Sequence, residues 1–129
     1  MSSTRTLSES QLAEELFYFY SPTRKVTFSW VAGCVGKGWT PLLSELCAKL
    51  FALGWDGGLE QVKEKFGSLR FYFINTCGPY SDIAFDVVNE AEAQSSQTCE
   101  ECGEWGEIKG KGWLRCLCKK CREAQNAGS

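Results

Sequence analysis

Four of the eight cysteines in this chain of 129 residues have the spacing of metal ligands. They form two Cys-x2-Cys pairs, Cys99 with Cys102 and Cys118 with Cys121, and fifteen residues separate the pairs. Two thiolate pairs at this spacing can surround one tetrahedral Zn²⁺, and four protein ligands leave no open coordination position for a substrate. We therefore predict one structural zinc ion held by Cys99, Cys102, Cys118 and Cys121.

The residues around these pairs predict a small zinc module. The first pair, followed by Gly103, is typical of a zinc knuckle, residues 104–117 of a short hairpin, and the second pair of the first turn of a final helix. This order is found in treble-clef and zinc-ribbon folds. Cys116 is an alternative ligand, but the Cys-x2-Cys spacing lets backbone N–H groups face the sulfurs, which favours Cys118. We expect a module over residues 99–129, packed on a domain formed by residues 1–98.

Two segments near the N-terminus carry signals for regular structure. A capping box at Ser8 and Gln11 predicts a helix over residues 9–20. The β-branched and aromatic residues of segment 26–32 predict a strand.

A glycine-rich loop over residues 33–38 is expected to precede a second helix. Thr40 is predicted to cap this helix, with Pro41 in the first turn and the end near Gly54. The loop and Lys37 also suggest a phosphate site, but the lysine is not where a phosphate-binding loop of the Walker type has it. A tight turn is the favoured interpretation.

Segment 59–75 predicts a β-hairpin. Gly67 and Ser68 suit a two-residue turn with glycine first, which places Lys65 opposite Arg70. The inward face is then formed by Val62, Phe66, Leu69, Phe71 and Phe73. The outward face gathers Lys63, Lys65, Arg70 and Tyr72.

Like charges opposite each other on a sheet are unfavourable unless an anion lies near them. One source of negative charge is internal: Asp82, Asp86 and Glu90 lie four residues apart on a helix expected over residues 82–94. The other is a phosphate or an acidic protein surface gripped by the lysines and the arginine, with Tyr72 available for stacking. The sequence leaves both alternatives open.

The composition argues against catalysis. The chain contains no histidine, which removes the commonest general base and the histidine-assisted serine and cysteine nucleophiles. Chemistry by a carboxylate enzyme through Asp56, Glu60 or Asp82 is the less favoured alternative, since no paired motif marks it. A net charge of −2 argues against binding duplex DNA through bulk electrostatics. No apolar run is long enough for a membrane span and no signal sequence is evident, so we expect a cytoplasmic protein.

Several short motifs together resemble a family of small uncharacterised bacteriophage and prophage proteins. The similarity covers residues 28–121, and its most distinctive part is the string KEKFGSLRFY. The other shared features are Gly38-Trp39, Ser95, both cysteine pairs and Gly112-Trp113. The resemblance implies a viral or mobile-element origin and action in the host cytoplasm. In that family the residue at Lys37 is often acidic, which weakens a phosphate role for the glycine-rich loop.

The sequence therefore predicts an α+β fold, with helices packed on a small antiparallel sheet, followed by the zinc module. We expect a non-catalytic binding protein that blocks or sequesters a host component, with antiphage defence as the candidate target. The alternative is a protein that binds a signalling nucleotide or single-stranded nucleic acid through Lys63, Lys65, Arg70 and Tyr72. The expected partner is thus a host protein or a signalling nucleotide.

Overall fold

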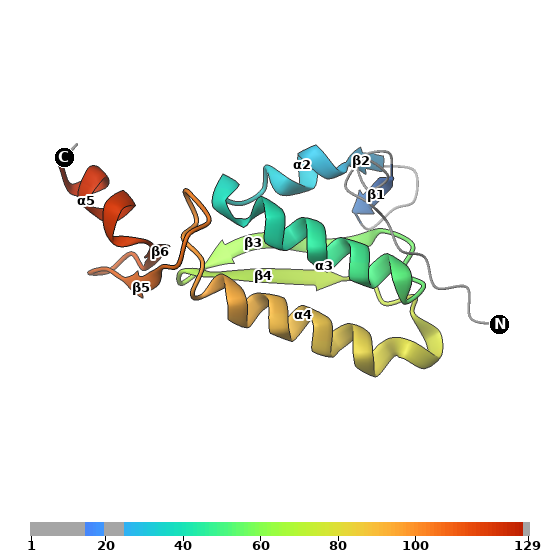
Figure 1. Cartoon of the computed structure of the whole chain (residues 1–129). Helices are drawn as coiled ribbons and strands as arrows, with labels where there is room; N and C mark the ends of the chain where they lie inside the picture. The colour runs from blue at the N-terminus through green and yellow to red at the C-terminus, as the bar shows by residue number, and fades with distance from the viewer. Residues whose placement is uncertain (1–14, 20–24, 128–129) are drawn as a thin grey trace.

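The computed structural model describes residues 15–19 and 25–127 and has an α+β architecture (Figure 1). A four-stranded sheet has the order β2-β1-β3-β4, in which β1 is parallel to β3 and the other neighbours are antiparallel. Its strands are β1 (Leu16–Phe19), β2 (Lys25–Thr27), β3 (Gly58–Lys65) and β4 (Ser68–Phe73). The helices of this part are α2 (Phe28–Ala32), α3 (Thr40–Ala52) and α4 (Ser81–Ser95), with short 3₁₀ turns at Lys37–Trp39 and Gly78–Tyr80.

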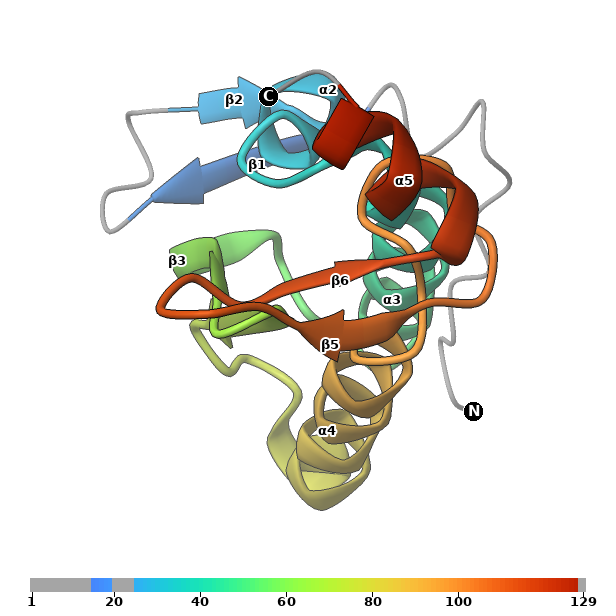
Figure 2. The ribbon, with the colours of Figure 1, turned by 90° about the vertical axis from the view of Figure 1, so that its left-hand side faces the viewer.

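The core lies between the sheet and the two long helices. Trp55 is at its centre, with ring centroids 4.9 Å from Phe51 and 5.7 Å from Phe17, and its indole N–H donates to the Gly58 carbonyl at 2.9 Å. The helices α3 and α4 bury apolar residues at helical spacing, which is why they cover one face of the sheet. In Figure 2 both helices lie on one side of β3 and β4, and no described helix lies on the other side.

At the free edge of β4, backbone N–H groups donate hydrogen bonds to side chains of α4 rather than to another strand. Leu69 N–H donates to the Ser95 hydroxyl at 2.7 Å, and Phe71 N–H donates to the Glu92 carboxylate at 2.9 Å. An edge strand with free N–H groups can pair with other chains. The buried Ser95 and the half-buried Glu92 therefore tie α4 to the sheet and protect this edge.

The expected N-terminal helix over residues 9–20 is wrong where the structure describes it. Residues 16–19 form β1, which pairs with β2 and β3 and buries Phe17 completely. The burial of this aromatic side chain between strands outweighs the local helix signal. The rest of the expected helix, residues 9–14 and 20, lies outside the described residues.

The strand expected over residues 26–32 is only partly correct. The strand β2 ends at Thr27, and residues 28–32 form α2 because the Thr27 hydroxyl accepts a hydrogen bond from Trp30 N–H at 3.3 Å. The expected cap at Thr40 is also wrong by one position, since Trp39 is the N-cap of α3. Pro41 lies in the first turn, as predicted.

The β3–β4 hairpin forms with a different turn from the one expected. The turn residues are Phe66 and Gly67, with φ values of 55° and 87°, and Lys65 pairs with Ser68. Two positive φ angles match a type I′ turn. Phe66 is consequently exposed (65%) and not part of the inward face. Lys63, instead of Lys65, lies opposite Arg70.

Candidate metal centre

The four predicted ligands come from three elements at one end of the molecule. Cys99 and Cys102 follow α4 in a turn, Cys118 comes directly after the strand β6 (Arg115–Leu117), and Cys121 lies in the first turn of α5 (Lys119–Ala127). The strand β6 pairs antiparallel with β5 (Glu107–Lys109). This hairpin and helix follow the predicted order of the module.

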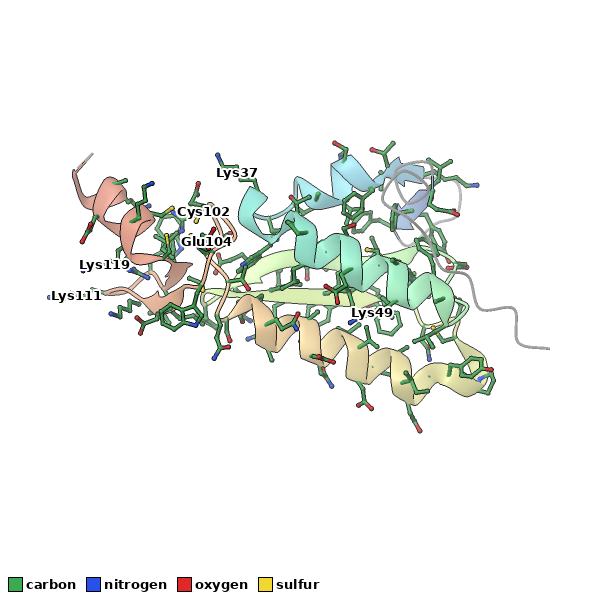
Figure 3. All side chains as sticks on the ribbon, viewed as in Figure 1. Lys37, Lys49, Cys102, Glu104, Lys111 and Lys119 are labelled. Atoms are coloured by element: carbon green, nitrogen blue, oxygen red, sulfur yellow. The ribbon has the colours of Figure 1, made fainter. Side chains whose placement is uncertain are left out.

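The geometry of the four sulfurs fits a tetrahedral metal. All four Sγ atoms lie within 4.8 Å of one another, and the Cys102 and Cys118 sulfurs are 3.6 Å apart. Four thiolates at about 2.3 Å from Zn²⁺ would be about 3.8 Å from each other. Figure 3 shows Cys102 beside the base of α5, where the cluster forms. The residues present therefore fit a metal site of the four-cysteine type.

Burial and hydrogen bonds shift the pKa values of Cys99, Cys102 and Cys121 in different directions. Burial raises the pKa of Cys99, but backbone N–H groups of both cysteine turns outweigh it and lower this pKa to about 6. A thiol hydrogen bond with Cys118, followed by burial, raises the pKa of Cys121 to about 12. For Cys102, a backbone hydrogen bond to Glu104 lowers the pKa, but burial and hydrogen bonds to Cys118 and Cys99 leave it raised.

These pKa values predict that metal binding releases protons. At about pH 7 Cys99 is mainly a thiolate, whereas Cys102 and Cys121 still carry protons that a metal must displace. We expect at least two protons to be released per zinc ion, and zinc affinity to rise with pH, most steeply below about pH 6. Titration of the metal-free protein with zinc in a weakly buffered indicator solution measures the release. Release of fewer than two protons would contradict this prediction.

The first cysteine turn packs directly against the glycine-rich loop at residues 33–38. Gly38 N–H donates to the Glu100 carbonyl at 2.7 Å, and the Trp39 indole N–H donates to the Thr98 carbonyl at 2.8 Å. A Cβ on Gly36 would lie 2.3 Å from the Glu100 side chain, and one on Gly38 would lie 2.1 Å from the Cys99 carbonyl oxygen. Both glycines are thus required by close backbone contact, and Lys37 extends outward from the ribbon (Figure 3).

A charged cluster fixes the first cysteine turn to the β5–β6 hairpin. The Arg115 guanidinium lies 2.9 Å from Glu101 and 3.7 Å from Glu100, and Glu100 is 7% exposed. Burial raises the pKa of Glu100, and the charge of Arg115 opposes this. The backbone adds a bond from Glu100 N–H to the Cys116 carbonyl at 2.9 Å. Sequence reasoning missed this cluster because no local pattern distinguishes these acids from solvent-exposed ones.

The tip of the β3–β4 hairpin also contacts the module. A Cβ on Gly67 would lie 2.8 Å from the Ile108 side chain of β5, so only glycine fits at this turn position. The module therefore packs against two parts of the main domain, the glycine-rich loop and the hairpin tip.

The structure brings the four residues of the proposed binding surface together on one face. We call this surface the outer face of the hairpin and define it by Lys63, Lys65, Arg70 and Tyr72. Their strand neighbours Val62, Leu69 and Phe71 are buried, so alternation points these four residues away from the core. Tyr72 is 45% exposed, and Lys63 lies directly opposite Arg70.

In the described part of the chain, the acidic residues of α4, Asp82, Asp86 and Glu90, form no ion pair with the basic residues of the outer face. The ion pairs found among the described residues join Lys49 with Glu45, Lys109 with Glu107, and Arg115 with Glu100 and Glu101. None of these pairs connects the outer face with the exposed acids of α4, because α4 packs on the opposite side of the sheet. Within the described residues, the basic side chains therefore have no acidic partner.

The remaining cysteines do not join the metal cluster. Cys47, Cys77 and Cys116 are buried and Cys34 is half-buried. Burial is the main cause that raises the pKa of Cys116 to about 11 and keeps this thiol protonated. These four cysteines therefore act as small apolar side chains.

Comparisons with family models, with curated proteins and with solved structures give no match. Among the described residues, no helix is both long and apolar enough to cross a membrane.

Proposed function

We propose that this protein is a non-catalytic binding protein, held together by a structural zinc ion, that blocks or sequesters a component of a host cell. The observation that carries the proposal is the outer face of the hairpin. Lys63 and Arg70 lie opposite each other there, and no described ion pair neutralises them. Such a like-charge pair lowers stability in the free protein. An anionic partner would supply the missing counter-charge.

The chemistry of the metal cluster supports a structural role for the ion. Four thiolates complete the tetrahedral coordination of zinc, so the ligand set provides no position for a substrate. The chain also has no histidine to act as a general base. Bound zinc would therefore supply cross-linking of the module rather than Lewis-acid chemistry.

The candidate carboxylate enzyme finds little support around Asp56. Its carboxylate accepts hydrogen bonds from the Tyr18 hydroxyl at 2.9 Å and from Gly58 N–H at 3.1 Å. These bonds hold the start of β3 against β1, which accounts for Asp56 without catalysis.

The host setting of the proposal rests on the resemblance to bacteriophage and prophage proteins. An acidic surface on a host protein, with a component of antiphage defence as the candidate, would match the positive charge of the outer face. Affinity purification from host cells, followed by mass spectrometry of proteins and small molecules, tests this. A component that the wild-type protein captures stoichiometrically, and that a variant of the outer face does not, would support it.

A second candidate is a nucleotide signal or single-stranded nucleic acid bound at the same face. The specific observation in its favour is the exposed ring of Tyr72, which follows Arg70 by two residues and lies on the same face. An aromatic ring beside cations offers stacking together with phosphate contacts.

Replacing both Lys63 and Arg70 with glutamine distinguishes a binding face from a scaffold. Because the pair lacks acidic partners, we expect the melting temperature of K63Q/R70Q to stay level or rise. Binding of the captured component should weaken by about 1.5–3 kcal/mol for each lost charge-assisted hydrogen bond.

The matched control for this prediction is Lys49→Gln on α3, where the lysine pairs with Glu45 at 2.9 Å on an exposed helix face. Loss of this surface pair should cost only about 0.3–0.5 kcal/mol and leave binding unchanged. A clearly lowered melting temperature of K63Q/R70Q with unchanged binding would mean that the outer face is scaffold.

A further inference from the structure

We infer that the outer face binds single-stranded nucleic acid, laid along β3 and β4 from Tyr18 at one end to Lys65 at the other. This inference rests on the second candidate function above and adds a stacking residue, Tyr18, that the sequence did not indicate. The observation is a linear arrangement of aromatic rings and cations on a sheet face that no described helix covers, in which Tyr72 and Phe66 are exposed and Tyr18 is half-buried.

The outward-facing residues follow one another in a row along the hairpin. Ile74 N–H donates to the Gly58 carbonyl at 2.9 Å, and the next outward-facing pairs are Gln61 with Tyr72, Lys63 with Arg70, and Lys65 with Ser68. Residues on one face of an antiparallel strand repeat every two positions, or about 6.8 Å. The three steps from Ile74 to Ser68 therefore span about 20 Å.

Tyr18 extends this row onto the neighbouring strand. Gly58 has no side chain, and the Tyr18 ring occupies the space above it, with ring atoms 2.7–3.0 Å from where a Cβ would be. Hydrogen bonds of 3.0 and 2.9 Å from its hydroxyl to Asp56 fix the orientation of the ring. Since Phe17 before it points into the core, Tyr18 lies on the same face as Tyr72.

The opposite end of the row also combines a cation with an exposed ring. Lys65 Nζ lies 5.4 Å from the centroid of the Phe66 ring, which is 65% exposed. Rings thus lie at both ends of the row and beside its middle, with three cations between them.

This arrangement suits a single strand better than the other anionic partners. Aromatic rings stack on unpaired bases and cations follow the phosphates, whereas a duplex presents no free base faces. An acidic protein surface needs the cations but not the exposed rings. The bulge between Leu59 and Gln61 leaves Glu60 exposed beside the row, and the exposed Asp56 lies against Tyr18 at its end, so both negative charges are expected to oppose a phosphate backbone.

Fluorescence anisotropy with a short labelled oligothymidine strand tests the inference on the full-length, zinc-loaded protein. We expect salt-dependent binding that Tyr72→Ala weakens roughly 5- to 150-fold and that Tyr72→Phe, which keeps the ring, largely retains. Lys63→Gln should reduce the slope of log affinity against log salt by about 0.7, the value for one phosphate contact on a single strand. Glu60→Gln should strengthen binding, and melting curves verify that each variant is folded.

Absence of oligothymidine binding at low salt, or equal affinity of Y72A and the wild-type protein, would overturn the inference. Equal affinity for a duplex of the same length would also overturn the inference, because this result would show that the protein recognises only phosphate charge and not unpaired bases. The proposed function fails separately. If the strand does not bind but capture of a host component still depends on Lys63 and Arg70, the binding face stands and its ligand is an acidic protein.

Discussion

Replacing Cys118 with serine is expected to abolish metal binding and to unfold the C-terminal module, residues 99–127 of the described structure. Serine cannot supply a thiolate, so one of the four vertices of the sulfur tetrahedron is lost. A structural zinc site contributes about 10–16 kcal/mol of apparent binding free energy near neutral pH, comparable with the whole stability of a small protein. The module buries few apolar side chains of its own, and it has no other source of that magnitude.

Metal content by mass spectrometry and two-dimensional amide NMR measure the two effects separately. We expect the zinc content of C118S to fall from one ion per chain to near zero, and the signals of β5, β6 and α5 to collapse toward unfolded positions. Signals of α3 and β3 should persist, because their core forms around Trp55 and not around the metal.

The matched control is Cys116→Ala, two residues earlier and within β6. Cys116 is fully buried and outside the sulfur cluster, so this variant should lose some packing energy but keep its zinc. Full metal retention in C118S, or equal metal loss in both variants, would contradict the four-cysteine assignment.

The convergence of the four cysteines could be predicted because ligand spacing is a local property. The turn at Cys99–Cys102 and the start of α5 each bring two sulfurs together within a few residues. Only the hairpin between them had to be inferred, and its length follows from the number of intervening residues. The same locality explains why α3 and α4 were correctly expected from their helical spacing.

The N-terminal strand could not be predicted for the opposite reason. The strand β1 is stabilised by pairing with β3, as between Tyr18 and Gly58, which are forty residues apart in the sequence. A capping motif depends only on a few neighbouring residues, so it cannot indicate pairing with a strand that comes much later in the sequence. Tyr18 was therefore missed as a surface residue of the sheet.

The turn of the β3–β4 hairpin shows how a distant contact selects between two local solutions. Placing Gly67 first or second in a two-residue turn is compatible with the sequence. In the fold, Ile108 of β5 leaves no space for a side chain at Gly67, and Glu64 accepts a hydrogen bond from Gly67 N–H at 2.7 Å. These contacts fix the second position and force Phe66 into a positive φ angle. The moved turn changes the partners across the strands but keeps each residue on its predicted face, except Phe66.

The glycine-rich loop suggested phosphate binding in the sequence, but in the fold its glycines serve the metal module. Glycine permits close approach of any backbone, whether of a ligand or of the protein itself. The sequence could not distinguish these uses. The contacts of Gly36 and Gly38 with Glu100 and Cys99 give the distinction and lead to a measurable coupling between the two parts of the chain.

We expect Gly38→Ala to destabilise the protein and to weaken zinc binding, although residue 38 is not a ligand. The new Cβ would lie 2.1 Å from the Cys99 carbonyl oxygen and 2.6 Å from the Glu100 carbonyl carbon, so the cysteine turn must move. Such overpacking typically costs about 1–3 kcal/mol, or roughly 4–12 °C in melting temperature at this chain length. Because the clash occurs in the metal-bound conformation of the turn, part of this free-energy cost lowers the affinity for zinc.

Gly33→Ala in the same loop is the matched control, since its Cβ would be 3.4 Å from the nearest atoms and its φ is −71°. Thermal melts and chelator competition on both variants measure the effects, and an unchanged zinc affinity in G38A would show that the loop supports the module without influencing its metal.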